Sequence, residues 1–175
     1  MTTVVVQAHP LEESYSAALR SRLVDALASA GVEVATFRLG QGEEPDAETL
    51  AAARRLVLVY PTWSGGLPAL LLGWVHRLLG GPPVLDRVEE LVVVTTCGSS
   101  KLINLVQGEW GRRYLKTVVL GRCAPGARFR WVPLYKIDRR TPAETAAHLD
   151  RVADAVGATS GPGRLRWTRS RLRSP

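Results

Sequence analysis

The first segment that could bind a ligand through recognisable chemistry begins at His9 and Pro10. It places hydroxyl groups at Ser14 and Ser16, directly before or within the first turn of a helix-like pattern. Hydroxyl groups, unpaired amides and the helix dipole make such a helix start an anion site, and phosphate is an anion that it suits. A plainer interpretation stays open, in which Ser14 only caps the helix and His9 is a surface residue.

The second and third segments could present main-chain groups to a flat ligand. Residues 56–60 form a continuous apolar run, which is typical of a central parallel strand buried on both faces. Pro61 ends the run, and Gly65 and Gly66 let the backbone turn sharply and approach a ligand closely. The third segment, residues 95–100, follows another apolar run and reads Thr-Thr-Cys-Gly-Ser-Ser.

The elements that must position these segments alternate between strands and helices. Strands are predicted at residues 3–8, 32–37, 56–60, 90–96 and 128–135, and helices at residues 15–30, 45–53, 67–79, 103–119 and 142–156. This alternation predicts an α/β fold, a doubly wound five-stranded parallel sheet with helices on both faces. We expect the flavodoxin-like order 2-1-3-4-5, which brings the loops after strands 1, 3 and 4 to one edge, beside the topological switch point.

Local signals support several of these boundaries. Pro68 fits the first turn of the third helix, and Thr141 with Glu144 forms a capping box for the last one. Gly108 and Gly111 weaken the fourth helix. No GxGxxG follows the first strand and no GxxxxGK[ST] occurs, so neither a Rossmann dinucleotide site nor a P-loop is indicated.

Composition predicts one globular domain, residues 1–158, followed by a basic tail, residues 159–175. The net charge of +7 comes in large part from five arginines in the last dozen residues. A basic tail can bind nucleic acid, but no nucleic-acid-binding fold supports that function here, and a solvated tail or an arm on a partner is favoured.

Cysteine usage and hydropathy help to predict the cellular compartment of the protein. Cys97 and Cys123 show no metal-ligand spacing, and two cysteines predict no disulfide framework, which fits a reducing cytoplasm. The first ten residues lack the basic region of a signal peptide, and no apolar stretch reaches membrane-spanning length. We therefore expect a cytoplasmic protein with no membrane insertion and no metal.

Taken together, the three segments resemble motifs of the NAD(P)H:quinone oxidoreductases, flavodoxin-like flavoenzymes of the DT-diaphorase and modulator-of-drug-activity type. The family's HPxxxSFN motif is matched from His9 by HPLEESYSAAL. Its P-x-x-W/Y-x-x-x-P-A-x-L-K-G-W-x-D-R-V segment, the most specific of the three, is matched from Tyr60 by YPTWSGGLPALLLGWVHRLL. Its TTGG loop is similar to TTCGSS, which begins at Thr95. The resemblance covers roughly residues 4–156.

The resemblance implies a set of cofactor-binding residues in three groups. The first loop would hold the flavin phosphate or ribityl end, the second would lie along the isoalloxazine, and the third would face its pyrimidine side. In this order the residues are His9, Ser14, Tyr15 and Ser16; Pro61, Thr62, Trp63, Ser64 and Gly65; and Thr95, Thr96, Cys97 and Gly98. Ser16 replaces the usual asparagine and Cys97 the first glycine of TTGG, and the tyrosine and histidine that polarise the quinone in DT-diaphorase have no match.

The implied function is hydride transfer from NAD(P)H, through a bound flavin, to a quinone or another small organic acceptor. The short chain favours FMN over FAD, and no side chain need act as a nucleophile or general base. Trp63 is the candidate that lines the substrate pocket. Four other functions stay open: a flavin-binding regulatory subunit, a flavodoxin-like electron carrier, a flavin-free scaffold, and a flavoenzyme of specialised metabolism.

A homodimer is expected, with the helix at residues 67–79 near the interface. Its sequence is apolar almost all round, which exceeds what contact with one sheet requires. The family resemblance points the same way.

Overall fold

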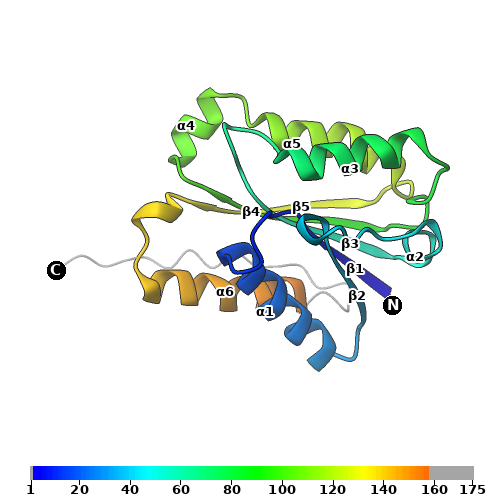
Figure 1. The fold of residues 1–175 in the computed structure, drawn as a ribbon, viewed down its shortest axis with the longest axis horizontal. Coiled ribbons are helices and arrows are strands. Elements are labelled where there is room, and N and C mark those ends of the chain that lie inside the picture. The colour runs from blue at the N-terminus through cyan, green and yellow to red at the C-terminus, as the bar shows by residue number, and fades with distance from the viewer. Residues whose placement is uncertain (1, 158–175) are drawn as a thin grey trace.

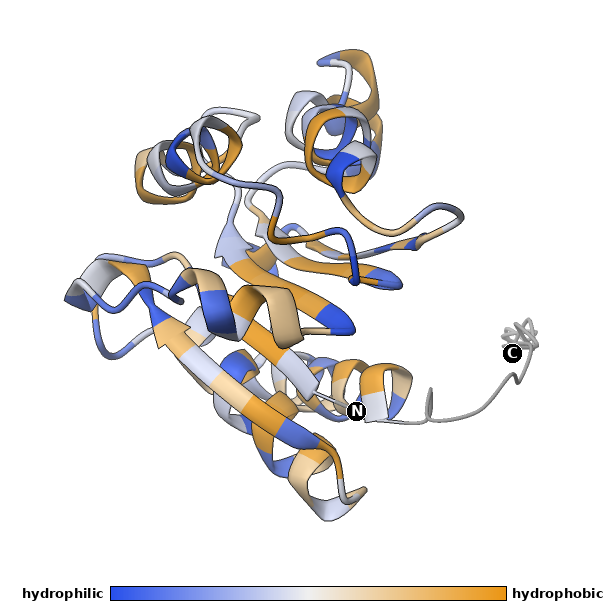
Figure 2. Cartoon of the chain, turned by 90° about the vertical axis from the view of Figure 1, so that its right-hand side faces the viewer, coloured by the Kyte–Doolittle hydropathy of each residue, from blue (hydrophilic) through white to orange (hydrophobic). Residues whose placement is uncertain are grey.

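Runs of valine and leucine form the middle of a five-stranded parallel sheet (Figures 1 and 2). The structure is a computed structural model that describes residues 2–157. Its strands are β1 (Thr2–Gln7), β2 (Glu33–Arg38), β3 (Arg55–Pro61), β4 (Glu90–Cys97) and β5 (Arg128–Tyr135). They lie in the order β2-β1-β3-β4-β5, and all neighbours pair in parallel. The predicted fold class and strand order are therefore confirmed.

Helices cover both faces of this sheet and enclose two cores. The α1 helix (Tyr15–Ser29) packs against α6 (Pro142–Gly157) on the lower face in Figure 1. Leu19, Leu23 and Leu27 fill that core from α1. The opposite core takes residues from α2 (Ala47–Ala52), α3 (Ala69–Gly80) and η2 (Leu115–Val119). The described residues also form three one-turn 3₁₀ helices: η1 (Leu39–Gln41), η3 (Leu120–Arg122) and η4 (Ile137–Arg139).

Side-chain caps determine where most helices begin. The Ser14 hydroxyl accepts from the Ala17 amide, and the Asp46 carboxylate accepts from the Thr49 amide at 2.7 Å. At α6, the Thr141 amide donates to the Glu144 carboxylate at 2.9 Å, while the Glu144 amide donates to the Thr141 hydroxyl at 3.2 Å. The predicted capping box is thus confirmed.

The predicted helix at residues 103–119 is wrong as one continuous element. The chain forms α4 (Lys101–Val106), leaves the helical conformation at Gly108 and Glu109, and resumes as α5 (Trp110–Tyr114) and the π-helical turn η2. Gly108 and Glu109 have φ of +81° and +44°, in the left-handed region. A glycine in that conformation is the usual end of an α-helix, so Gly108 terminates α4 rather than weakening a longer helix.

The α3 helix is less apolar on its outer side than its sequence suggests. Leu71, Trp74 and Val75 are buried against the sheet. His76 and Arg77 are exposed, and so is Leu70, at 36%. Pro68 stands one position earlier than expected, at the N-cap.

At the amino edge of the sheet a buried ion pair joins two strands to the end of α6. Arg55 and Glu90 are each 1% exposed, with Nε and Oε2 separated by 2.8 Å. Arg55 donates to the Val156 carbonyl and Arg130 to the Ala155 carbonyl, at 3.2 and 2.6 Å. These cations lie at the negative end of the helix dipole, so they fix the last turn of α6 on the sheet.

Two further predictions from the sequence concern membrane spans and the basic tail. Within residues 2–157 no helix has the length and hydropathy needed to span a membrane. The basic tail predicted at residues 159–175 lies outside the described residues.

Candidate functional site

The loops that follow β1, β3 and β4 meet at the carboxyl edge of the sheet, the left end in Figure 1. The chain leaves β1 toward β2 and leaves β3 in the opposite direction, toward β4. The gap between β1 and β3 is therefore the topological switch point, where open α/β sheets bind their ligands.

Hydrogen bonds join the loop after β3 to the end of β4. The Thr62 amide donates to the Thr96 carbonyl at 2.7 Å, and the hydroxyls of Thr62 and Thr95 are 3.0 Å apart. The Cys97 thiol contacts the Thr62 hydroxyl at 3.5 Å. Four of the predicted cofactor-binding residues thus form one network, which fixes the second loop against the third.

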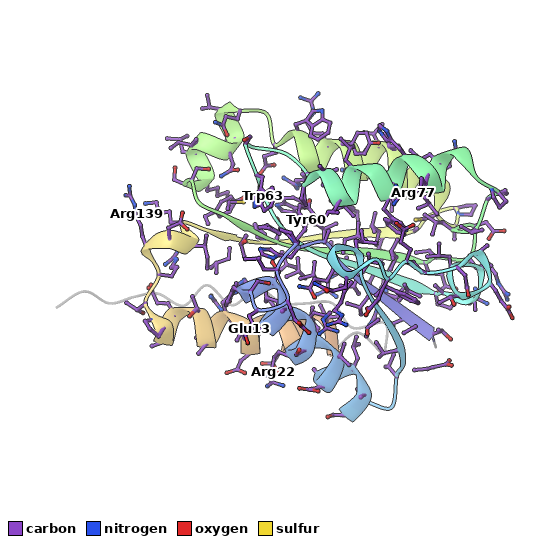
Figure 3. All side chains as sticks on the ribbon, viewed as in Figure 1. Glu13, Arg22, Tyr60, Trp63, Arg77 and Arg139 are labelled. Carbon is purple, nitrogen blue, oxygen red and sulfur yellow. The ribbon has the colours of Figure 1, made fainter. Side chains whose placement is uncertain are left out.

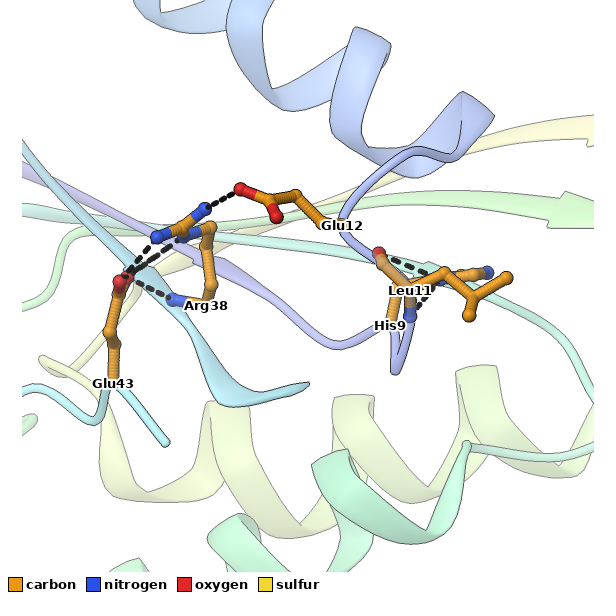
Figure 4. A network of polar contacts seen from close by, with 5 residues as sticks. All are labelled: His9, Leu11, Glu12, Arg38 and Glu43. Carbon is orange, nitrogen blue, oxygen red and sulfur yellow. Dashed lines mark hydrogen bonds and ion pairs between the residues drawn. The ribbon is translucent and has the colours of Figure 1, made fainter. Parts of the chain in front are cut away.

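The loop after β1 contacts the second loop through two rings. The rings of His9 and Trp63 lie edge to face, with centroids 6.3 Å apart. The His9 imidazole is held in turn by the Leu11 amide, which donates to Nδ1 at 3.1 Å (Figure 4). A Cβ on Gly40 would come within 1.9 Å of the His9 carbonyl oxygen, so the η1 turn supports this loop from behind.

The second loop turns through two residues with positive φ. Ser64 and Gly65 have φ of +49° and +76°, and Trp63 and Gly66 exchange main-chain hydrogen bonds at 3.3 and 2.9 Å. This is the geometry of a type I′ turn. Trp63 lies just beyond the carboxyl end of β3, past Tyr60 in Figure 3. This turn leaves the residue 49% exposed.

At the start of α1 the predicted residues take different directions. Ser14 caps the helix, as the plainer interpretation predicts, and Ser16 is buried. The Tyr15 hydroxyl instead donates to the Thr145 carbonyl at 2.9 Å and lies 2.9 Å from His148 Nδ1, on α6. Burial raises the pKa of Tyr15 to about 12 and lowers that of His148 to about 4. The structure therefore places the Tyr15 side chain between α1 and α6, apart from the three loops.

The third loop exposes main-chain groups rather than side chains at the sheet edge. Thr95, Thr96 and Cys97 are buried, whereas Gly98 is exposed. Burial also raises the pKa of the Cys97 thiol, which keeps it protonated at neutral pH and disfavours a thiolate reaction. The Lys136 amide donates to the Ser99 carbonyl at 3.1 Å, so the loop after β5 joins this edge as well.

Arg38 neutralises acidic groups beside the first loop. Its guanidinium contacts the carboxylates of Glu43 at 2.6 Å and Glu12 at 3.2 Å (Figure 4). The hydrogen bond from Arg38 lowers the pKa of Glu43. This ion pairing reduces the negative charge near a helix start that is predicted to bind phosphate.

A small surface pocket lies between the second and third loops and α5. Thr62, Gly65 and Cys97 line it together with Glu109 and Tyr135, two residues that sequence reasoning missed. The Glu109 carboxylate accepts from the Tyr135 hydroxyl at 3.2 Å, and its side chain is only 12% exposed. Burial and the Glu109 charge raise the pKa of Tyr135.

Arg112 is a third pocket residue that sequence reasoning missed, and it donates to Glu109 at 2.6 Å. One sequence signal could have pointed to this group, because Glu109 is the sole acidic residue between Ser99 and Ala127 and follows a glycine. Among residues 2–157 no group of three His, Cys, Asp or Glu side chains is arranged to hold a metal ion.

The sheet order and the three loops define a doubly wound α/β protein whose loops after β1, β3 and β4 meet at the switch point. The sequence profile of the family with a flavodoxin-like fold matches residues 1–101, more than half of the chain, and the protein belongs to this family. No curated protein matches the sequence.

Several solved structures are similar to this one. An NAD(P)H:quinone oxidoreductase from Methanothermobacter marburgensis is 18% identical, with a TM-score of 0.78 over 95% of this chain and 99% of that one. An FMN-dependent NADH-azoreductase from Bacillus anthracis, in complex with FMN, is 13% identical, with a TM-score of 0.72 over 91% and 99%. Smu.1420 from Streptococcus mutans is 19% identical, with a TM-score of 0.76 over 90% and 100%. At these identities the likeness shows the fold.

Proposed function

We propose that this protein is a flavin-dependent NAD(P)H oxidoreductase that uses FMN to pass hydride to a quinone-like or other small organic acceptor. The observation that carries the proposal is the meeting of three loops at the switch point, with Trp63 exposed on the second of them. The names of two similar structures, an NAD(P)H:quinone oxidoreductase and an FMN-dependent NADH-azoreductase, support it.

The donors at this edge fit a flavin. The amides of Tyr15 and Ser16 open α1 and have no partner within the helix, as a phosphate site requires. The turn at Ser64 and Gly65 brings main chain to the surface without a side chain at Gly65. Gly65 has φ of +76°, so a side chain there would strain the turn, and the Gln107 amide, 3.2 Å from the position of a Cβ, would have to shift.

We assign roles to these residues group by group. Ser14, Ser16 and the first amides of α1 hold the phosphate, with His9 beside them. Pro61, Thr62, Trp63, Ser64 and Gly65 lie along the ring, and the main chain of Thr96, Cys97 and Gly98 faces its pyrimidine side. Thr95 acts indirectly, because it is fully buried and its hydroxyl contacts Thr62. Tyr15 contributes its amide, since its hydroxyl is bonded to α6.

The bound flavin would supply the redox chemistry, taking up hydride from NAD(P)H and returning it to the acceptor. The protein's own part is to bind, orient and stabilise charge. Main-chain amides at Cys97 and Gly98 would stabilise the negative charge that the reduced ring carries on its pyrimidine side. Trp63 would form one wall of the space that NAD(P)H and the acceptor occupy in turn.

The remaining expectations stay predictions. A homodimer with α3 near the interface is tested by sedimentation at micromolar concentration. A cytoplasmic location is supported by Cys97 and Cys123, which are both free thiols in the structure.

The direct test of the cofactor is to purify the protein and analyse its chromophore. We expect yellow protein that releases FMN on denaturation, identified by chromatography against FMN and FAD standards. Colourless protein that takes up neither flavin would contradict the proposal.

A further inference from the structure

The short helix α4 places its polar residue inward and its apolar residues outward. Asn104 is buried, and its amide donates to the Ser99 hydroxyl at 2.8 Å and the Ser100 carbonyl at 2.9 Å. Four apolar neighbours are exposed: Leu102 (69%), Ile103 (48%), Leu105 (60%) and Val106 (80%). At about 100° per residue, these four side chains cover about 160° of the helix circumference. A surface helix without a binding partner normally packs its apolar side against the core of its own chain.

Trp110 is a further exposed apolar residue, at the start of α5 just beyond α4. The residue is 46% exposed, and its ring stacks on Tyr114 with centroids 5.1 Å apart. We call Leu102, Ile103, Leu105, Val106 and Trp110 the α4 patch. Monomeric proteins seldom expose so many neighbouring apolar side chains unless the surface binds a partner.

Basic residues accompany the α4 patch. Between Ser99 and Ala127 the chain carries five Lys or Arg residues and one acid, Glu109. Glu109 is largely buried and paired with Arg112. Lys101 begins α4 and Arg113 lies beside Gly108 at its other end, 3.8 Å from the position of a Cβ there. Within residues 2–157, neither Lys101 nor Arg113 forms an ion pair.

We propose that the α4 patch docks on the surface of a lipid bilayer with anionic headgroups. Exposed Leu, Ile and Val side chains suit the boundary between headgroups and acyl chains, and a tryptophan suits the interface. Lys101 and Arg113 would contact the headgroups, where a negative surface attracts each basic residue. The contact would lie at the bilayer surface, because the six residues of α4 are far fewer than a membrane span requires.

The charges favour this partner over a second copy of the chain. A twofold interface brings the same surface of each subunit together, so the cations around the α4 patch would face one another. Between Ser99 and Ala127 the sole carboxylate is that of Glu109, which already binds Arg112 and Tyr135. An anionic lipid surface complements both the apolar and the basic residues.

Docking would also bring the candidate site close to the lipid. The α4–α5 segment touches the second loop, where a Cβ on Gly65 would lie 3.2 Å from Gln107 and one on Gly66 would lie 3.2 Å from the Trp110 ring. Bilayers dissolve hydrophobic quinones, so the acceptor class that fits a docked site is a lipid-soluble quinone. This consequence rests on the proposed function, whereas the docking itself needs no flavin.

The test is sedimentation of the purified full-length chain with phosphatidylglycerol vesicles and, separately, with phosphatidylcholine vesicles. We expect the unmodified chain to bind the anionic vesicles. The double substitution Leu102→Asp, Val106→Asp is expected to lower the partition coefficient at least about tenfold, because it removes apolar surface and adds repulsion.

A matched control adds the same two charges elsewhere. Ser21→Asp with Ala143→Asp changes exposed positions on α1 and α6, across the sheet from α5, and is expected to lower binding no more than about threefold. Lys101→Gln with Arg113→Gln is expected to weaken binding to anionic vesicles specifically.

Three results would overturn the docking proposal. One is an unmodified chain that stays in the supernatant with both lipids. Another is an equal loss of binding in the two aspartate pairs, which would assign the attraction to net charge alone. The third is a lipid-free dimer, seen by sedimentation velocity, that Leu102→Asp, Val106→Asp converts to a monomer, because the patch would then contact a second copy. Protein that binds vesicles but holds no flavin would contradict only the proposed function.

Discussion

The two edges of the sheet are built on opposite principles. At the amino edge, Arg55 and Glu90 form a fully buried ion pair, and cations bind the last carbonyls of α6. At the carboxyl edge lie all three non-glycine residues with positive φ in residues 2–157: Ser64, Glu109 and Lys136. Such conformations are strained for residues with a side chain and gather where function requires them. The comparison assigns fold stabilisation to the amino edge and supports the proposal that the carboxyl edge binds the ligand.

The largest expected effect comes from removing a charge at the amino edge. Glu90→Ala leaves the Arg55 guanidinium buried without its carboxylate, which should lower the free energy of unfolding by about 3–5 kcal/mol. Denaturant titration measures the loss. Glu89→Ala is the control, because it breaks the exposed pair with Arg54 and should cost no more than about 1 kcal/mol. Similar losses in both variants would show that the buried pair is not a main stabilising contact.

A smaller, pH-dependent effect is expected from His148, between the two edges. Burial lowers its folded pKa to about 4, below the ordinary histidine pKa of about 6.5, with Arg151 and Arg140 adding repulsion. The unfolded chain therefore binds the proton more readily, and this contribution to stability is lost as pH falls from about 6.5 toward 4. His148→Gln should remove about 1–3 kcal/mol of that pH dependence. Denaturant unfolding at a series of pH values across this range measures the change, and an unaltered pH dependence in the variant would show that His148 is not its source.

Substitutions at two glycines that share a backbone conformation distinguish the effect of backbone strain from the loss of ligand binding. Gly65 and Gly31 have φ of +76° and +71°, at the carboxyl and amino edges respectively. Changing either to valine should destabilise the protein by about 1–3 kcal/mol. Only Gly65→Val should also lose flavin, because its loop is proposed to lie along the ring. Flavin occupancy after purification checks this. Equal occupancy in the two variants would place the flavin away from the second loop.

The smallest effect on stability is expected from Trp63→Ala. Its side chain is half exposed, so the free energy of unfolding should change by no more than about 1 kcal/mol. Flavin should remain bound, while turnover with both NAD(P)H and the acceptor falls at least about tenfold, because the wall of the shared space is lost. Steady-state rates with each substrate measure this, and a variant with unchanged rates would remove Trp63 from the pocket.

Sequence patterns predicted the sheet well because its strands depend on short-range signals. The apolar run ending at Tyr60 and the capping box at Thr141 both reflect burial and pairing within a few residues. The group around Glu109 was not predictable in this way, since Tyr135 meets it from a strand 26 residues further along. The direction of Tyr15 likewise depends on α6, more than a hundred residues away. Gly108 was seen as a weakness, but its role as a helix end required the backbone conformation.

The most direct test of the central claim is anaerobic mixing of the purified protein with NADH or NADPH in a stopped-flow instrument. If the protein is an NAD(P)H oxidoreductase, the yellow absorbance of bound FMN bleaches within the turnover time, and adding a quinone restores it. Trp63→Ala should bleach more slowly at equal flavin occupancy, and Gly65→Val should show no bound flavin to bleach. Flavin that stays oxidised with both nicotinamides would contradict the account and identify the protein as a flavin binder without dehydrogenase activity.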